Sequence, residues 1–68
     1  MELLDTKKDL GGGRLVTLRY FFELINGDYH DLRANDLTTR EKKMAFTAKE
    51  WGITEEQASA AYTHAGWA

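Results

Sequence analysis

Residues 14–25 read Arg-Leu-Val-Thr-Leu-Arg-Tyr-Phe-Phe-Glu-Leu-Ile, and this stretch decides the predicted fold. With a period of two, one face of the segment is entirely apolar and consists of Val16, Leu18, Tyr20, Phe22 and Leu24. With a helical period, the polar residues scatter around the circumference and leave no continuous apolar stripe. The β-branched and aromatic content also favours a strand. The pattern therefore predicts a strand over 14–25, and a helix that ends at Asn26-Gly27 is the alternative.

Asn26-Gly27 is typical of a hairpin turn, so we expect a second strand over 29–34. A two-residue loop would turn charged residues of that strand toward the apolar face, where unpaired charges are costly to bury. A three-residue loop with Gly27 in a left-handed bulge is therefore predicted. It places on the apolar face His30, Leu32 and Ala34.

Two capping boxes predict helices in the C-terminal half. Thr38 and Glu41 have the spacing of the first box, which opens a helix over 39–51 that ends at Gly52. Thr54 and Gln57 form the second box, with acidic residues in the first turn, and the helix over 55–65 stops at Gly66. The faces expected in the core are lined by Met44, Ala45, Ala48 and Trp51 in the first helix and by Ala58, Ala61, Tyr62 and Ala65 in the second.

These elements predict an α+β fold in which two antiparallel helices pack on one face of a β-hairpin. Gly11-Gly12-Gly13 is a flexible joint, so residues 1–13 are expected to form a flexible leader and residues 14–68 a single small domain. Whether Leu3, Leu4 and Leu10 of the leader dock on the domain or fray is left open. The alternative is an all-α bundle of three helices, which requires residues 14–25 to be helical.

The composition is that of a small ordered domain. The 68 residues have 43% hydrophobic and 29% charged side chains, a net charge of −2 and no cysteine. The missing cysteines exclude a disulfide framework, a thiolate metal site and cysteine catalysis. The acidic N-terminus is not typical of a signal peptide, and the longest apolar run is too short to cross a bilayer, so we expect a cytoplasmic location.

The spacing from Met44 to Ala61 resembles a helix-turn-helix motif, in which the start of the second helix reads bases in the major groove. That start is Glu55-Glu56-Gln57 here, and two carboxylates would face the phosphates of DNA. A plain helical hairpin is therefore the preferred interpretation. A small DNA-binding regulator is the alternative function, and its nucleic-acid contacts would be Arg40, Lys42, Lys43 and Lys49.

We expect no metal, cofactor, small-molecule substrate or catalytic activity. Residues 28–31 gather two aspartates and His30, but strand alternation turns Asp31 away from the histidine, and neither calcium nor zinc spacing is present. Ser59 is the only serine and has no histidine at helical spacing. The glycine triplet lacks the Gly-Lys-Ser/Thr ending of a phosphate-binding loop.

The remaining signal is a set of aromatic and charged residues on the outward face of the predicted hairpin, typical of protein-binding hot spots. They are Arg19, Phe21, Glu23, Tyr29, Asp31 and Arg33. These residues predict a small non-enzymatic protein that binds a macromolecular partner, most simply another protein. Its size is that of phage and mobile-element accessory or inhibitor proteins, such as anti-CRISPR proteins. Unpaired strand edges further predict a homodimer.

Overall fold

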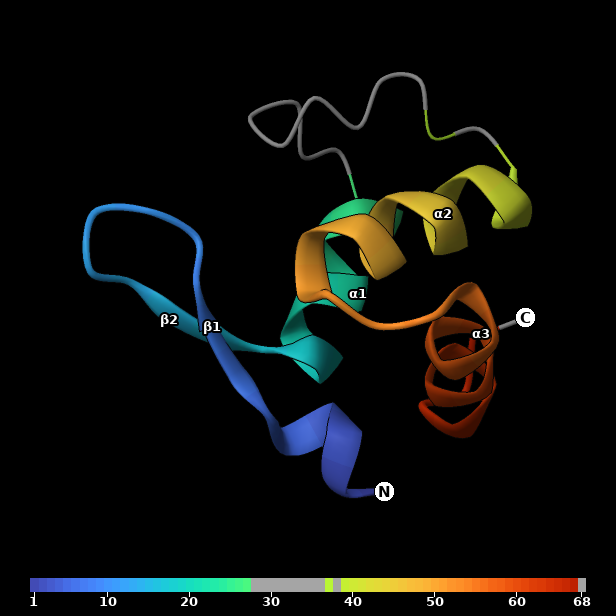
Figure 1. Cartoon of the computed structure of the whole chain (residues 1–68), viewed down its shortest axis with the longest axis horizontal. Helices are drawn as coiled ribbons and strands as arrows, with labels where there is room; N and C mark the ends of the chain where they lie inside the picture. Colours follow the sequence, from blue (N-terminus) through green and yellow to red (C-terminus); the bar gives the residue numbers. More distant parts are fainter. Residues whose placement is uncertain (28–36, 38, 68) are drawn as a thin grey trace.

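The computed structural model describes residues 1–27, 37 and 39–67. It begins with a 3-10 helix, η1 (Glu2–Asp5), and a two-stranded antiparallel sheet of β1 (Lys7–Asp9) and β2 (Leu15–Thr17). Three helices follow: α1 (Leu18–Asn26), α2 (Arg40–Trp51) and α3 (Glu55–His64). The predicted α+β class is confirmed, with the hairpin at the left and the helices in the centre and at the right of Figure 1.

The hairpin lies earlier in the chain than predicted. Lys8 pairs with Val16, and the connecting loop contains Gly11, Gly12 and Gly13, all with positive φ. Glycine adopts these angles without the steric cost that a Cβ would add, so the predicted joint serves as the hairpin loop. The predicted second strand over 29–34 lies outside the described residues.

The predicted strand over 14–25 is wrong beyond Thr17, where the chain becomes α1. The Thr17 side chain caps this helix by accepting a hydrogen bond from the backbone N–H of Tyr20 at 3.1 Å. From that point the apolar residues have helical spacing, and those that share the buried stripe are Leu18, Phe21, Phe22 and Ile25. The stretch 14–25 joins three strand residues to eight helical ones, so a single period over the whole stretch hides the helical stripe.

The C-terminal helices begin and end close to the predicted positions. Thr54 and Gln57 form the expected capping box of α3, and Gly52 ends α2 in the left-handed conformation. The cap of α2 is Thr39, whose side chain accepts from the backbone N–H of Lys42, rather than Thr38. In Figure 1, α2 runs across the molecule and α3 lies below it with its axis turned downward. The two helix axes therefore cross, whereas an antiparallel pair was expected.

The core lies where the three helices and η1 meet. Phe21 packs against Phe46 and Trp51 of α2 with ring centroids 6.0 and 5.6 Å apart, and Phe22 packs edge-on against Tyr62 of α3 at 5.0 Å. The two phenylalanines of α1 therefore join different helices. Of the core positions expected on α2 and α3, Met44, Ala48, Ala58, Ala61 and Tyr62 are buried, whereas Trp51 and Ala65 are half-buried and Ala45 is exposed.

The N-terminal residues contribute to this core, so the leucines of the expected leader dock on the helices. Leu4 of η1 has no exposed surface and belongs to the same cluster as Leu18 and Phe22. The backbone N–H of Leu18 donates to the carbonyl of Thr6 at 3.1 Å, which continues the strand pairing to the start of α1. Residues 2–17 thus pack as part of the same domain as the helices.

Candidate interaction surfaces

The predicted outward face of residues 19–33 is not assembled in the described part of the chain. Phe21 is 1% exposed and lies in the core, so its assignment to a partner-binding face was wrong. The reason is periodicity: successive helical residues turn by about 100°, so Phe21 points away from the exposed Arg19 and Glu23, which lie one helical turn apart. Arg19 approaches Asp5 at 4.0 Å, with both side chains largely exposed. Outside the described residues lie Tyr29, Asp31 and Arg33.

Two of the four basic residues assigned to nucleic-acid contact are held by contacts within the protein. The Arg40 guanidinium lies 5.1 Å from the ring centroid of Tyr62 and donates to the Thr63 hydroxyl at 2.6 Å. It also donates to the Ser59 hydroxyl and carbonyl at 3.3 and 3.4 Å. These contacts tie the first residue of α2 to α3. Lys42 and Lys49 are exposed.

Lys43 belongs to a polar network that joins the three helices. Its ammonium donates to the Asn26 side-chain oxygen at 2.7 Å, and the Tyr62 hydroxyl donates to the same oxygen at 2.7 Å. The Asn26 amide nitrogen donates to the carbonyl of Phe22 at 2.7 Å, which fixes the orientation of the side chain. One amide of α1 thus satisfies a donor from α2 and a donor from α3.

Asn26→Leu is expected to lower the free energy of unfolding by about 2 kcal/mol, because two partly buried donors lose their acceptor. Tyr62→Phe removes one donor alone and is expected to cost about 1 kcal/mol. In urea unfolding, the double variant should lose less than the sum of the two single variants. Additive losses would show that Asn26 and Tyr62 do not share this hydrogen bond.

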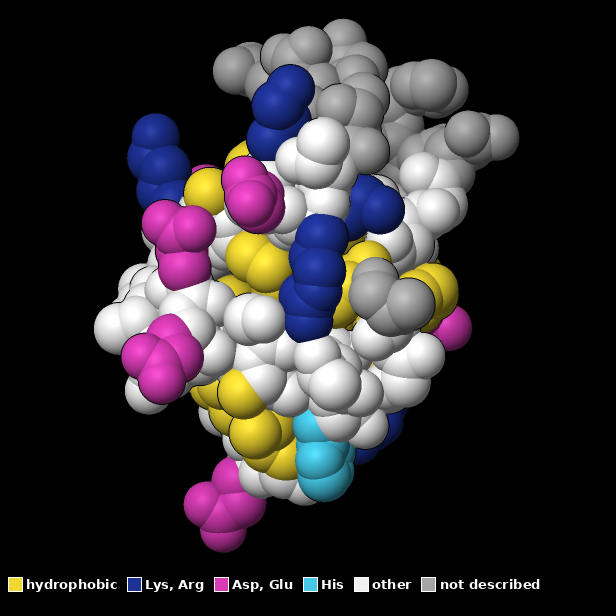
Figure 2. All heavy atoms as spheres, turned by 90° about the vertical axis from the view of Figure 1, so that its right-hand side faces the viewer, with side chains coloured by type: hydrophobic (Ala, Val, Ile, Leu, Met, Phe, Trp, Pro, Cys, Tyr) yellow, Lys and Arg dark blue, Asp and Glu magenta, His cyan; other side chains and the backbone are white. Residues whose placement is uncertain are grey.

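A shallow pocket of about 320 Å³ lies between α2 and α3. The residues that line it are Arg40, Glu41, Met44, Glu55, Glu56 and Ser59. Met44 is buried and supplies the apolar floor, whereas the three glutamates are exposed. Figure 2 views the molecule from the side of α3, where acidic and basic side chains lie beside apolar atoms. The pocket combines an apolar floor with three carboxylates and one arginine turned toward α3.

The glutamates stand at this pocket because both helices begin there. Glu41 lies in the first turn of α2, and Glu55 and Glu56 lie in the first turn of α3. Carboxylates are favoured at these positions by the helix dipole. The crossing of the two helices brings both acidic first turns to the same pocket. From the sequence, the two turns were predicted only as separate helix caps.

The charge at the start of α3 is unfavourable for contact with DNA. The turn from Gly52 to Thr54 does place α3 across α2 in the manner of a helix-turn-helix pair. The exposed residues that would meet the bases are nevertheless Glu55, Glu56 and Gln57. Their carboxylates would lie near the phosphates of DNA, with Arg40 as the one cation among the described residues that line the same pocket.

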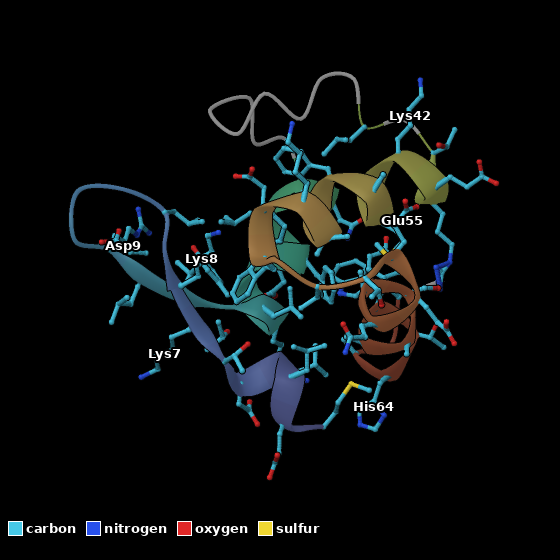
Figure 3. The ribbon with its side chains drawn as sticks, in the orientation of Figure 1. Lys7, Lys8, Asp9, Lys42, Glu55 and His64 are labelled. Atoms are coloured by element: carbon cyan, nitrogen blue, oxygen red, sulfur yellow. The ribbon has the colours of Figure 1, made fainter. Side chains whose placement is uncertain are left out.

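The β-hairpin presents a second surface, which the sequence analysis missed. Leu15 of β2 is 62% exposed, more than any other large hydrophobic residue among those described. Strand alternation places Leu15 on the face opposite Val16, which is buried. Lys7 and Lys8 on β1 and Arg14 beside Leu15 make the hairpin basic, with Asp9 as its acidic residue. In Figure 3, Lys7 and Lys8 lie on the hairpin, on the opposite side of the molecule from Glu55.

The described residues contain no group of three or more histidine, aspartate or glutamate side chains that could hold a metal ion. The aspartates and histidine at 28–31 that were considered for such a site lie outside those residues. Among the helices that the structure describes, none is long and apolar enough to cross a membrane.

Comparisons with protein-family models, with curated proteins and with solved structures found no match to this chain.

Proposed function

We propose that this protein is a small non-enzymatic binding protein that acts by stoichiometric interaction with a protein partner. The observation that carries the proposal is the acidic pocket with an apolar floor between α2 and α3. A lysine or arginine side chain suits such a pocket, because its aliphatic stem packs on apolar surface while its charged head meets carboxylates. Here Met44 would contact the stem, and Glu41, Glu55 and Glu56 would surround the head.

The same charges favour a protein partner over a nucleic acid. Phosphate groups would be repelled by the three glutamates of the pocket, whereas basic side chains on a protein would be attracted. Among the described residues that line the pocket there is one hydroxyl, Ser59, and it accepts a hydrogen bond from Arg40. A binding role therefore accounts for these residues better than nucleophilic catalysis does. The inhibitor class, anti-CRISPR-like or otherwise phage-encoded, stays a hypothesis based on size.

The proposal predicts that neutralising the pocket weakens partner binding. Glu55→Gln with Glu56→Gln should reduce capture of the partner from a host lysate by about tenfold, since two exposed charge pairs contribute about 1 kcal/mol or more together. The Thr54–Gln57 capping box stays intact in this variant, so α3 should still form. The captured fraction is measured by quantitative mass spectrometry, with nucleic acid assayed in the same eluates.

The matched control is Glu2→Gln with Glu23→Gln. It changes the net charge by the same amount at two exposed residues that do not line the pocket. It should retain the partner at the wild-type level. Capture of nucleic acid in place of protein, or equal loss of the partner in both variants, would refute the proposed function.

A further inference from the structure

The hairpin and the pocket have complementary chemistry. Residues 7–17 of the hairpin carry three basic side chains and one acidic side chain, and the Asp9 carboxylate already accepts a hydrogen bond from the backbone N–H of Gly11 at 2.7 Å. Leu15 adds an exposed apolar side chain, with Asp9 directly across from it on β1 and Lys7 on the same face of the sheet. The hairpin therefore offers an exposed apolar side chain on an element that carries three basic residues and one acidic residue.

The pocket offers the opposite combination. Its floor is the buried Met44, and its exposed charges are three carboxylates. The guanidinium of Arg40 is turned toward Ser59 and Thr63 and bonded to both. An exposed apolar side chain on a basic hairpin would thus meet an apolar floor in a pocket with more acidic than basic side chains.

A chain cannot make this contact with itself. The hairpin and the start of α3 lie on opposite sides of the molecule, as the positions of Lys7 and Glu55 in Figure 3 show. We propose that the β-hairpin of one copy docks in the α2–α3 pocket of a second copy. This inference rests on the proposed function, in that it names a second copy of the chain as one protein partner of the pocket.

In the proposed contact, Leu15 packs against Met44, while Arg14 and Lys7 pair with Glu55, Glu56 and Glu41. The contact joins two different surfaces, so repeated docking gives a closed ring or an open chain according to the rotation between copies. The interface consists of few side chains, and specific interfaces of high affinity are much larger. Self-association should therefore be weak, with a dissociation constant of about 0.1–1 mM.

Sedimentation equilibrium of the full chain tests the inference. At a chain concentration near 1 mM and about 20 mM salt, the average mass should clearly exceed the monomer mass, and it should fall toward the monomer at about 500 mM salt, because salt screens exposed charge pairs. A monomer mass at low salt and high concentration would overturn the inference. A larger mass that does not change with salt would also overturn it, since the contact would then not depend on these charges.

Leu15→Ser locates the interface, with Tyr20→Ser as its control. Both residues are large, apolar and exposed, and only Leu15 lies on the hairpin. Leu15→Ser should raise the dissociation constant at least fivefold, and Tyr20→Ser should leave it unchanged. Equal effects of the two variants, or no effect of Leu15→Ser, would overturn the assignment of the hairpin.

Charge reversal identifies the pairing. Lys7→Glu with Arg14→Glu in one chain, and Glu55→Lys with Glu56→Lys in another, should each abolish self-association at low salt. Mixed together, the two variants should associate again in low salt, because each supplies a surface that complements the other. Circular dichroism shows whether the lysines in the first turn of α3 unfold the second variant. If they do, Glu55→Gln with Glu56→Gln replaces it, and this replacement should itself lose self-association at low salt. Failure of the mixture or of the Gln variant would overturn the proposal.

The two proposals fail separately. If the chain stays monomeric but Glu55→Gln with Glu56→Gln still loses a protein partner from the lysate, the pocket binds a different protein and the inference about a second copy is wrong. If the chain associates as described and no lysate protein depends on the pocket, self-association is the pocket's role and the proposal of a separate protein partner is wrong.

Discussion

Phe21→Ala is expected to destabilise the protein by about 3–5 kcal/mol, as much as Phe22→Ala, because each opens a cavity in a packed core. Phe21 is 1% exposed and contacts Phe46 and Trp51, whereas Phe22 is fully buried against Tyr62. A domain of this length has a total stability of about 3–10 kcal/mol. Either substitution should therefore leave a large unfolded fraction at 25 °C, measured by urea titration with circular dichroism.

Tyr20→Ala serves as the control for this comparison, since Tyr20 is the neighbouring aromatic residue and is 39% exposed. It should cost less than about 1 kcal/mol. If 14–25 were a strand, Phe21 and Phe22 would face opposite sides, and only Phe22→Ala would be damaging. A Phe21→Ala protein as stable as the wild type would contradict the assignment of α1.

The failed strand prediction has an identifiable physical cause. Residues 15–17 form a strand, and residues 18–26 form a helix whose buried face is wide and apolar. Leu18, Phe22 and Leu24 lie on this face, and the same three residues also fit a period of two. The residue that separates strand from helix is Thr17, the helix N-cap within the stretch 14–25. Local capping chemistry carried more information here than the average periodicity.

The helices at 39–51 and 55–65 were predictable because their signals are local. A threonine cap, a glutamine three residues later and a glycine in the left-handed conformation act within one turn of the chain. The pocket is different, because its two acidic first turns lie fourteen or more residues apart and meet only through the crossing of α2 and α3. No sequence pattern specifies that crossing, so the glutamates were predicted as caps but not as one site.

The structure of the N-terminal segment also depends on contacts that no local sequence pattern specifies. Glycines 11–13 were interpreted as a joint between a leader and the domain, but they form the loop of a hairpin whose first strand is Lys7–Asp9. Strand β1 is short and polar, with no apolar alternation to indicate it. Its pairing with Leu15–Thr17 holds η1 against α1, and Leu4 enters the core as a result.

Leu4→Ala is therefore expected to cost about 3 kcal/mol of unfolding free energy, within the range for fully buried leucines. Leu4 has no exposed surface, and it packs in the cluster that contains Leu18, Phe21 and Phe22. A chain this small has no second core to compensate for the loss. The effect should appear as a lower urea midpoint with an unchanged slope, which indicates a change in stability rather than in the surface exposed on unfolding.

Leu15→Ala is the matched control, because it removes the same atoms from a side chain that is 62% exposed. It should change the urea midpoint little, since its methyl groups already contact water. A leader that is separate from the domain would make both substitutions equally harmless. Equal midpoints for Leu4→Ala and Leu15→Ala would therefore show that the domain begins after the glycines, and a selective loss for Leu4→Ala would show that η1 and the hairpin are part of its core.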